Sequence, residues 1–504
     1  MRSTAGAQRP ARFLTAGLVA ACLGYFMVIL DTTIVNVALP AVRADLHTDL
    51  AGLQWVVDSY LVVLAAGILT GGALSDRCSA RTVFCWGVGL FTAASVACGL
   101  AWNIAALIAA RAAQGAASAM LVPSSLALVR AEYDDPGMRR RAIGWWATIA
   151  AFAAAGGPVV GGLGTEEWSW RWVFFVNVPF GLACLVLTTR HVPPGAGLPR
   201  ALDLRGQLLA VLSLGGLAVA LIESARAGLT PFVLLAAWAC LVTGGAFVFV
   251  EQRTGEAMLP LGLFRDSTFT GGAFIGVLIN FGFYGVLFVI NLYFQQLRGA
   301  SPLQAGFAVL PQLGFIMLGS SFSARISARA GGPRLSILLS LTCLGVGVSG
   351  VMLAGTHTPY PVLIAPLALT GFGMGVVMPA VTAALTDAAP LRHSGLASGV
   401  INSARQSGSV IGIAVLGGLV ARLDDFVLAV RLAAGVAAIG FFLAVVIAAV
   451  TVRHSRTVRT TTVLPTRPVS AGSTGGRLPV DRTFRGAQLD TTAAPVLADD
   501  LCGD

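Results

Sequence analysis

Ionisable side chains lie inside several long apolar runs of this 504-residue sequence. If such a run spans a bilayer, a charge at its centre costs at least about 2.5–3.5 kcal/mol, so the residue needs a partner, a watery cavity or a neutral form. These positions can therefore carry a proton or bind a charged group. The residues are Asp31, Asp58, Arg111, Arg405 and Arg431, with Glu223 near the end of a run.

Asp31 lies deep in the first apolar run, within the segment LDTTIVNVALP (Leu30–Pro40). Burial disfavours the charged form of a carboxyl group, so this side chain can take a proton from one side and release it to the other. It can also attract a cationic substrate. The alternative is a helix-packing aspartate that forms hydrogen bonds with Thr32, Thr33 or Asn36.

Asp58 and Arg111 offer related chemistry in the second and fourth runs. Asp58 lies in WVVDSYL (Trp55–Leu61), nearer a membrane face, and its alternative role is that of a solvated interfacial carboxylate. Arg111 lies in LIAARAAQGAASA (Leu107–Ala119) and stays charged at any relevant pH, so it can tune a nearby acid but cannot carry the proton. Its alternative role is a structural ion pair that fixes helix packing.

Two further arginines lie late in the sequence. Arg405, in the segment SARQSG, lies inside the thirteenth apolar run and can serve the second half of the chain as Arg111 serves the first. Arg431 lies near the end of a run, where a long side chain can extend to the membrane surface.

The apolar runs that hold these residues predict an all-α integral membrane protein. The sequence is 56% hydrophobic and only 11% charged, whereas soluble chains average about 25% charged residues. A membrane-spanning helix needs about 20 mostly apolar residues. We expect fourteen spans, near residues 13–39, 53–74, 82–101, 105–129, 141–163, 169–189, 205–223, 231–250, 269–294, 302–325, 334–354, 360–388, 394–420 and 426–451.

The basic residues, which are all arginine, indicate how the spans are oriented. The net charge is +10, but these arginines lie in short loops between apolar runs, which favours a topological role over nucleic-acid binding. With the amino terminus placed inside, 25 arginines fall on the inner side and five on the outer side. Because positive loops face the cytoplasm, we expect both termini there. The outer five are Arg43, Arg171, Arg226, Arg298 and Arg422.

A weak internal sequence repeat suggests two six-helix bundles around a central cavity, with two additional helices inserted between them. The segments GALSDRCSAR (Gly72–Arg81) and GSSFSARISAR (Gly319–Arg329) each follow the second span of a six-span set. The polar tail has the composition of a disordered segment. The expected parts are a cytoplasmic amino terminus (1–12), the first bundle (13–189), a linker with the seventh and eighth spans (190–268), the second bundle (269–451) and a disordered cytoplasmic tail (452–504).

Glycines in two runs have competing explanations. The segment from Gly144 to Gly162 is rich in small residues, and it can form a gating hinge or simply allow close helix packing. The GFGMG of Gly371–Gly375 lacks a preceding strand and a Walker lysine, so we interpret it as packing. The sequence has no ATP-binding motif, metal-ligand spacing or nucleophile–base pairing, so we expect neither an enzyme nor a cofactor and predict that an ion or solute gradient supplies the energy.

Taken together, these segments resemble the major facilitator superfamily, specifically its fourteen-helix drug:proton antiporters, over all but about the last fifty residues. LDTTIVNVALP and WVVDSYL are similar to the signatures of the first two helices of that subfamily. LIAARAAQGAASA is similar to the helix-four motif, which implies a proton-coupling role for Arg111. The fifth run resembles the helix-five antiporter motif, associated with exporters, through Gly144, Gly157, Pro158, Gly161 and Gly162.

The loop after the second span departs from the family pattern. The motif usually resembles GxLxDRxGRR, and this chain keeps Gly72, Asp76, Arg77 and Arg81. In the last three positions of the motif, Ser79 replaces the glycine and Ala80 replaces the first arginine. These replacements predict a weaker network of gating charges. A milder departure lies in the fifth run, where Ala153 occupies a position that is commonly glycine in the family.

The resemblance implies a proton-coupled exporter of a lipophilic drug or antibiotic in a bacterial plasma membrane, working by alternating access as a monomer. Arginine-only basic usage and alanine richness suggest a high-GC genome such as that of an actinobacterium, where self-resistance to an antibiotic is a plausible role. Two alternatives stay open: a proton-coupled exporter of a metabolite, siderophore or peptide, and a membrane receptor or scaffold without transport.

Overall fold

The computed structural model describes residues 14–133, 135–193, 203–254, 261–329, 332–388 and 394–452, and their helices belong to one compact unit. Within these ranges the chain is helical and contains no strand. Fourteen helices are long and apolar enough to cross a membrane, which agrees with the fourteen predicted spans. The expected amino-terminal segment 1–12 and nearly all of the expected disordered tail lie outside the described residues.

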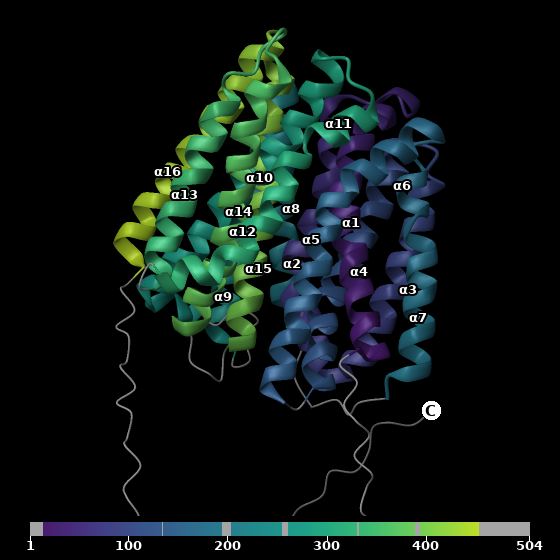
Figure 1. Ribbon diagram of the computed structural model, residues 1–504. Coiled ribbons are helices and arrows are strands. Elements are labelled where there is room, and N and C mark those ends of the chain that lie inside the picture. The colour runs from purple at the N-terminus through teal and green to yellow at the C-terminus, as the bar shows by residue number, and fades with distance from the viewer. Residues whose placement is uncertain are drawn as a thin grey trace, which may run out of the picture. The chain divides into compact units, whose positions relative to one another are not determined.

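The helices alternate in direction and are joined mostly by short turns (Figure 1). The first six spans are α1 (Ala16–Asp45), α2 (Leu50–Cys78), α3 (Ala80–Gly99), α4 (Ile104–Glu132), α5 (Pro136–Glu167), and α6 (Trp172–Phe175) with α7 (Asn177–His191). The next two are α8 (Leu204–Ala227) and α9 (Pro231–Arg253). The last six are α10 (Ser267–Leu292), preceded by η1 (Leu261–Arg265) and continued by η2 (Tyr293–Leu297), then α11 (Pro302–Ala308) with α12 (Leu310–Arg329), α13 (Pro333–Val351), α14 (Tyr360–Ala388), α15 (Ser394–Arg422) and α16 (Phe426–Thr451).

Polar side chains fix where several helices begin. Asp49 precedes α2 and its carboxylate accepts from the backbone N–H of Gly52 at 2.9 Å. Asn103 precedes α4 and accepts from the N–H of Ala106 at 2.8 Å. Such caps satisfy N–H groups that have no partner within the first helical turn. The turns can therefore be short without leaving helix ends unsatisfied.

Two spans contain a break that the sequence analysis did not predict. The run 169–189 is divided into α6 and α7, and the run 302–325 is divided into α11 and α12. Pro179 follows the first break and Pro311 the second. Proline has no N–H to donate to the carbonyl of the residue four positions earlier, so the backbone hydrogen-bond ladder is interrupted there.

Two sets of six spans pack among themselves and form the two bundles. In the first, α2 packs on α4, α1 on α5, and α3 on both α4 and α7. In the second, α10 packs on α15 and α16, while α12 and α13 pack on α14. Figure 1 shows the two sets side by side, the first in purple and blue and the second mainly in green and yellow. The predicted fold of two six-helix bundles plus two additional helices is confirmed.

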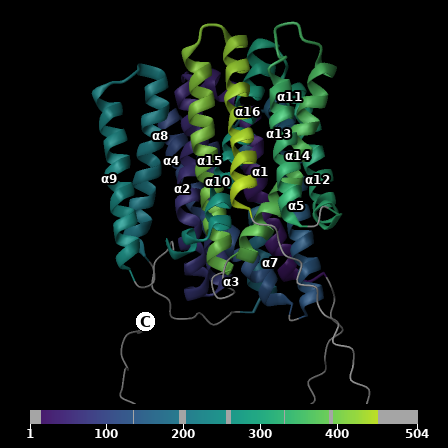
Figure 2. The same cartoon turned by 90° about the vertical axis from the view of Figure 1, so that its left-hand side faces the viewer.

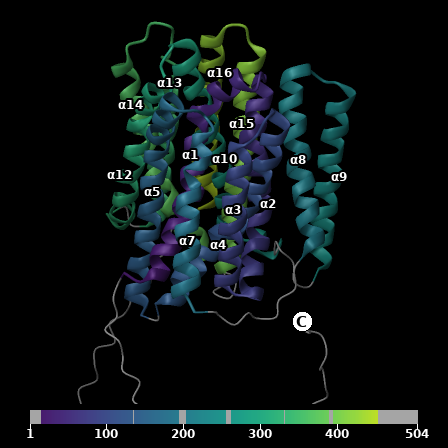
Figure 3. The same ribbon diagram turned by 90° about the vertical axis from the view of Figure 1, so that its right-hand side faces the viewer.

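Helices α8 and α9 form a hairpin at the edge of the bundle (Figures 2 and 3). They pack on each other, and α8 also packs on α2 and α15. A hydrogen bond of 2.5 Å from Thr70 Oγ1 to Gln207 Oε1 joins α2 to α8. The side chains of α9 are largely exposed, with Leu241 at 75%, as suits a helix that contacts lipid. The inserted pair thus flanks the contact between the two bundles, while the predicted boundaries at 190 and 268 stay a prediction.

We call the end of the bundle at which α1 begins the basic end, because the loops there carry most of the arginines of the chain. The opposite end, where α1 finishes at Asp45, is called the far end. With these names, α2 runs from the far end to the basic end and α15 runs the opposite way. The orientation of the two ends in a membrane stays a prediction.

The turn between α2 and α3 at the basic end is built on one unusual residue. Ser79 has φ 81° and ψ 142°, a backbone conformation that glycine adopts readily and other residues rarely do. It stands where the family motif has glycine. Its hydroxyl partly compensates, because Oγ accepts from the N–H of Thr82 at 3.4 Å and begins α3. The departure from the motif therefore adds backbone strain at this turn.

Replacing Ser79 with glycine is expected to stabilise the protein. A residue in this region of backbone conformation is strained by about 1–3 kcal/mol. Exchanging a serine cap for glycine loses only about a few tenths of a kcal/mol. The net gain of about 1 kcal/mol should raise the thermal unfolding midpoint of the purified protein by about one degree. Ser79→Ala is the matched control, because it keeps the strain and removes the cap. A lower midpoint for Ser79→Gly than for the native chain would contradict this account of the turn.

Candidate functional site

Asp31 of α1 and Arg111 of α4 form a completely buried ion pair, with side-chain exposures of 0% and 1%. Arg111 NH1 donates to Asp31 Oδ2. The other carboxylate oxygen, Oδ1, accepts from Gln114 Nε2 at 3.2 Å and from Asn177 Nδ2 at 3.3 Å. Each oxygen of the carboxylate therefore accepts at least one hydrogen bond.

The guanidinium of Arg111 is held on all sides. Its Nε donates to the carbonyl oxygen of Val56 at 3.0 Å, and NH1 also donates to Gln114 Oε1 at 2.9 Å. The ring of Tyr60 lies 4.3 Å from the guanidinium carbon, and the ring of Phe174 lies at 6.0 Å. A buried cation with a carboxylate, a carbonyl and an aromatic face as neighbours is compensated for its loss of water.

Gln114 and Asn177 are site residues that the sequence analysis did not select. Gln114 lies one helical turn after Arg111 and also donates to Ser95 Oγ at 2.8 Å. Its i,i+3 spacing from Arg111 was a signal that could have found it. Asn177 lies in the segment SWRWVFFVNVPFG, and no spacing links it to Asp31 in the sequence. Only the packing of α7 on α1 brings the two together.

The alternative in which Asp31 is held by polar neighbours on its own helix is wrong. Thr32 Oγ1 donates to the carbonyl of Val28 at 2.8 Å, and Asn36 Nδ2 donates to the carbonyl of Thr32 at 2.9 Å. These side chains satisfy the backbone of α1. The partners of Asp31 come from α4 and α7 instead.

Asp58 lies at the contact between α2 and α15, where the two bundles meet. It is 0% exposed, and neither carboxylate oxygen has a hydrogen-bond partner. Gln54, one turn earlier on the same face, donates from Nε2 to the carbonyl of Ile413 at 3.0 Å. Because the carboxyl group is fully buried, the alternative role of a solvated interfacial carboxylate is wrong, while the nearness of Asp58 to a membrane face stays a prediction. Burying a polar group without a hydrogen-bond partner costs free energy, which makes Asp58 a candidate for a functional carboxyl group.

Arg405 of α15 packs its stem against α10 and has no carboxylate partner among the described residues. Its NH1 donates to Asn402 Oδ1 at 3.4 Å, and its buried Nε has no partner. Tyr25 of α1 and Tyr284 of α10 lie within electrostatic range of the guanidinium. Arg405 and Arg111 therefore differ in their surroundings, although the sequence analysis gave them parallel roles.

Arg431 and Glu223 lie apart from these groups. The Nε of Arg431 donates to the carbonyl of Ala354 at 3.0 Å, after the end of α13. Glu223 accepts from Arg226 NH1 at 3.4 Å near the end of α8, and Arg226 also pairs with Asp49 at 2.8 Å. Both are contacts of helix ends at the far end.

The glycines of α5 fall into two groups. A Cβ at Gly161 would lie 2.8 Å from the carbonyl oxygen of Ile34, and one at Gly157 would overlap Thr33, so these two glycines pack on α1. A Cβ at Gly162 would lie 2.6 Å from the backbone of Leu303 in α11. Gly144 has no such neighbour. Close packing therefore explains the part of the motif that lies toward the far end.

At the far end, α5 also holds α11 through Glu166 and Pro158. The carboxylate of Glu166 accepts from Ser301 Oγ at 2.7 Å and from the N–H of Leu303 at 3.2 Å. The carbonyl of Pro158 lies against Gly306, where a Cβ would overlap it. These contacts join the first bundle to the second.

A second junction at the far end joins α1 to the helix that extends α10. Gln295 Nε2 in η2 donates to the carbonyl of Val37 in α1 at 3.0 Å. Together with the contact between α5 and α11, this bond holds the two bundles together at the far end.

The loop motif at the basic end connects neighbouring helices of the first bundle. Arg81 NH2 donates to the carbonyl of Thr189 near the end of α7 at 2.9 Å. Gly72 leaves room, because a Cβ there would lie 3.8 Å from Pro123. The preceding residue, Gly71, packs tightly on the backbone of Ala119 instead. Gly71 lies outside the family spacing, so the motif alone did not indicate this contact.

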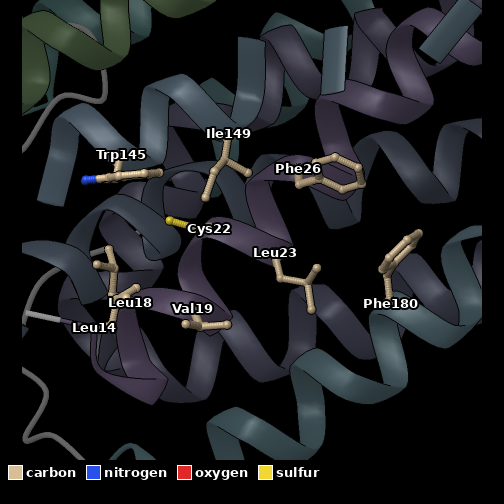
Figure 4. A pocket seen from close by; sticks show the side chains of 9 residues that line it. All are labelled: Leu14, Leu18, Val19, Cys22, Leu23, Phe26, Trp145, Ile149 and Phe180. Atoms are coloured by element: carbon tan, nitrogen blue, oxygen red, sulfur yellow. The ribbon is translucent and has the colours of Figure 1, made fainter. Parts of the chain in front are cut away.

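An apolar pocket of about 290 Å³ lies between α1, α5 and α7 (Figure 4). Its lining has no charged side chain, and Phe26 and Phe180 meet edge to face across it with centroids 5.5 Å apart. The labelled side chains in Figure 4 include Trp145 of α5, which is 52% exposed. The pocket is an apolar cavity in the first bundle, and neither Asp31 nor Arg111 lines it.

Comparison with known proteins decides the family. The sequence model of the Major Facilitator Superfamily matches residues 21–413 and 273–474. The chain belongs to the Major Facilitator Superfamily. The predicted family is therefore confirmed, and membership places the chain among multi-pass membrane transporters.

Curated members of the superfamily that resemble this chain are named for drug resistance. The methylenomycin A resistance protein of Streptomyces coelicolor is 37% identical over 81% of this chain and 86% of its own length. The multidrug resistance protein Stp of Mycobacterium tuberculosis is 36% identical over 80% and 75%. The tetracenomycin C resistance and export protein of Streptomyces glaucescens is 34% identical over 81% and 76%. The predicted drug-efflux subfamily is confirmed by these relatives.

A solved structure agrees with the fold. A crystal structure of the peptide transporter POT with sulfate matches 88% of this superfamily member and 97% of the POT chain, with a TM-score of 0.65 and 18% identity. At that identity the match concerns the arrangement of helices alone.

Proposed function

We propose that this superfamily member exports a lipophilic drug or antibiotic across a bacterial plasma membrane in exchange for protons. The observation that carries the proposal is the buried Asp31–Arg111 pair, in a chain whose relatives are named resistance and efflux proteins. We propose that the basic end is cytoplasmic, since arginine-rich loops face the cytoplasm. Resistance to an antibiotic that the host itself makes is a role that fits such an exporter.

Alternating access in this proposal depends on the contacts at the far end. The α5–α11 and α1–η2 contacts are both formed in the structure. This arrangement corresponds to a conformation that is closed at the far end. Export requires these contacts to part, so that a substrate loaded from the basic end is released at the far end. The contact between α2 and α15, which includes Gln54 and Ile413, serves as the axis between the bundles.

In the proposed cycle, Asp31 takes up a proton when the far end opens. Protonation removes the negative charge of Asp31, so the electrostatic attraction between Asp31 in α1 and Arg111 in α4 is largely lost. Return to the present conformation restores the ionised carboxylate among its three donors and releases the proton toward the basic end. Asp58 is a second titrating group in the proposal, because it is buried without a partner between the bundles.

The driving force is then the proton gradient. One elementary charge moving across 100 mV contributes about 2.3 kcal/mol, and the pH difference adds to it. Exchange of protons for drug can therefore hold the internal drug concentration well below the external one.

A resistance screen tests the proposal. We expect expression in an efflux-deficient, drug-sensitive bacterium to raise the inhibitory concentration of at least one lipophilic antibiotic several-fold. The control is the same host with a chain carrying both Asp31→Asn and Arg111→Gln, matched for membrane expression. Unchanged susceptibility across a chemically varied panel would contradict drug export, and transport of a metabolite, siderophore or peptide in vesicles would then support the alternative exporter.

A further inference from the structure

Arg405 is a half-buried cation with fewer partners than Arg111, the arginine of the buried ion pair. A guanidinium keeps its charge at any accessible pH. Its Nε is buried and has no hydrogen-bond partner, and its bond to Asn402 is long, at 3.4 Å, and made to a neutral amide. Among the ion pairs of the described residues, none includes Arg405. Arg111, by contrast, has a carboxylate, a backbone carbonyl and an aromatic face.

The surroundings of Arg405 come from both bundles. Tyr25 of α1 and Tyr284 of α10 interact electrostatically with it. Gly276 of α10 makes room for its stem, since a Cβ there would lie 3.1 Å from Arg405 Cγ. Tyr25 in turn stacks on Trp146 of α5, with ring centroids 3.8 Å apart and planes 5° from parallel. One member of this stack, Tyr25, is therefore within electrostatic range of Arg405 and belongs to the opposite bundle.

The buried carboxylates among the described side chains are Asp31, Asp58 and Glu251, and none of them is bonded to Arg405. Glu251 lies against Gly206 of α8. Asp31 is neutralised by Arg111 inside the first bundle. Asp58 lies on the face of α2 that meets α15, and no bond joins it to Arg405. Along this contact Gln54 meets Ile413, so Asp58 lies nearer the far end than Arg405 does. No carboxylate among the described side chains supplies the counter-charge.

Building on the proposed export function, we propose that the exported compounds are organic acids. Arg405 binds the carboxylate, and the Tyr25–Trp146 stack with Tyr284 binds an aromatic or alicyclic body. A guanidinium matches a carboxylate with two parallel hydrogen bonds, and aromatic faces bind apolar rings. Export of an anion is also favoured by a negative interior, since the membrane potential acts on its charge. The ligand thus brings the counter-ion that the protein lacks.

Binding to the purified full-length protein in lipid nanodiscs tests this inference. The probes are 1-pyrenebutyrate, 2-naphthoate and cyclohexylacetate, each paired with its methyl ester. We expect at least one acid to bind about tenfold more tightly than its ester, a difference of about 1.4 kcal/mol. Arg405→Gln should abolish the preference, and Arg405→Lys should retain part of it because the charge remains. Arg431→Gln is the matched control and should behave as the native chain.

Three results would overturn the inference: no acid binds, acids and esters bind equally, or Arg405→Gln keeps the preference while eluting and melting as a folded protein. Its failure is distinct from failure of the export proposal. A chain that confers drug resistance and exchanges protons for neutral drugs, without preference for acids, retains its function and loses the inference. A chain that binds acids through Arg405 but moves no drug in vesicles retains the inference about ligand chemistry and loses the function.

Discussion

Asp31→Asn is expected to abolish resistance and pH-driven export and to lower the amount of folded protein in the membrane. The substitution leaves Arg111 buried with no opposite charge, and removal of one partner of a buried ion pair destabilises a protein by about 3–5 kcal/mol. The single variant therefore mixes a folding defect with a coupling defect. Asp31→Glu should recover part of the activity, because the charge is kept while the geometry shifts.

The double variant Asp31→Asn with Arg111→Gln separates the two defects. It removes both charges and keeps groups that can form hydrogen bonds at both positions, so we expect its folded yield to recover toward that of the native chain. Drug should still move down its own gradient in vesicles, since the substrate path is intact. Acceleration by an imposed pH difference should be lost, because no carboxylate remains at this site. Vesicle uptake measured with and without the pH difference gives the comparison.

A double variant that keeps the full acceleration would show that Asp31 is a structural residue and not the proton carrier. Asp58→Asn is the informative partner experiment in that case. Its carboxyl is already without a hydrogen-bond partner, so the amide should fold well. Loss of proton coupling in Asp58→Asn alone would then move the carrier to the contact between the bundles.

Gly162→Ala is expected to shift the protein away from the conformation described here and to slow export strongly. The added Cβ would lie 2.6 Å from the Cα of Leu303 and from the carbonyl of Pro302, which are backbone atoms that cannot move aside separately. Overpacking of this kind costs about 1–3 kcal/mol. A cost of 1.4 kcal/mol changes a conformational ratio about tenfold, so the ratio of molecules open at the far end to molecules closed there should rise about tenfold. The distance between labels at His47 and Thr356, one in each bundle, should lengthen.

Gly156→Ala is the control for this experiment. It lies on the same helix, and a Cβ there meets no atom within 4 Å. We expect native transport rates and native label distances for it. If Gly162→Ala exported drug at the native rate with unchanged distances, the α5–α11 contact would not be a gate.

The sequence predicted the fold because its strongest signals are those that a membrane demands. Fourteen apolar runs, arginines in alternate loops and short connections leave few arrangements other than a helical bundle. Asp31 and Arg111 were found for the same reason, since a charge inside an apolar run must have a purpose or a partner. The family resemblance implied a proton-coupling role for Arg111, and the structure adds that its partner is Asp31.

The partners of those charges could not be predicted, because hydropathy does not tell which way a uniformly apolar helix is rotated. Asp58 illustrates this, since a solvated carboxylate was one alternative for it, whereas it is fully buried one turn after Gln54, which contacts α15. The contact of Asn177 with Asp31 could not be predicted for the same reason. The helix breaks before Pro179 and Pro311 could not be predicted either, because they depend on the helices that pack beside them. Gly71 was overlooked beside a motif glycine, since only the neighbouring backbone of α4 distinguishes the two.

The most direct test of the account is proton movement driven by drug in inverted membrane vesicles that hold a preformed pH gradient. The drug is one to which the native chain gives resistance. The account predicts that adding it dissipates the gradient in vesicles with the native chain and does not in vesicles with the Asp31→Asn, Arg111→Gln chain. If the native chain moves the drug equally fast with and without the gradient, and no protons flow, exchange of drug for protons at the buried Asp31–Arg111 pair is contradicted.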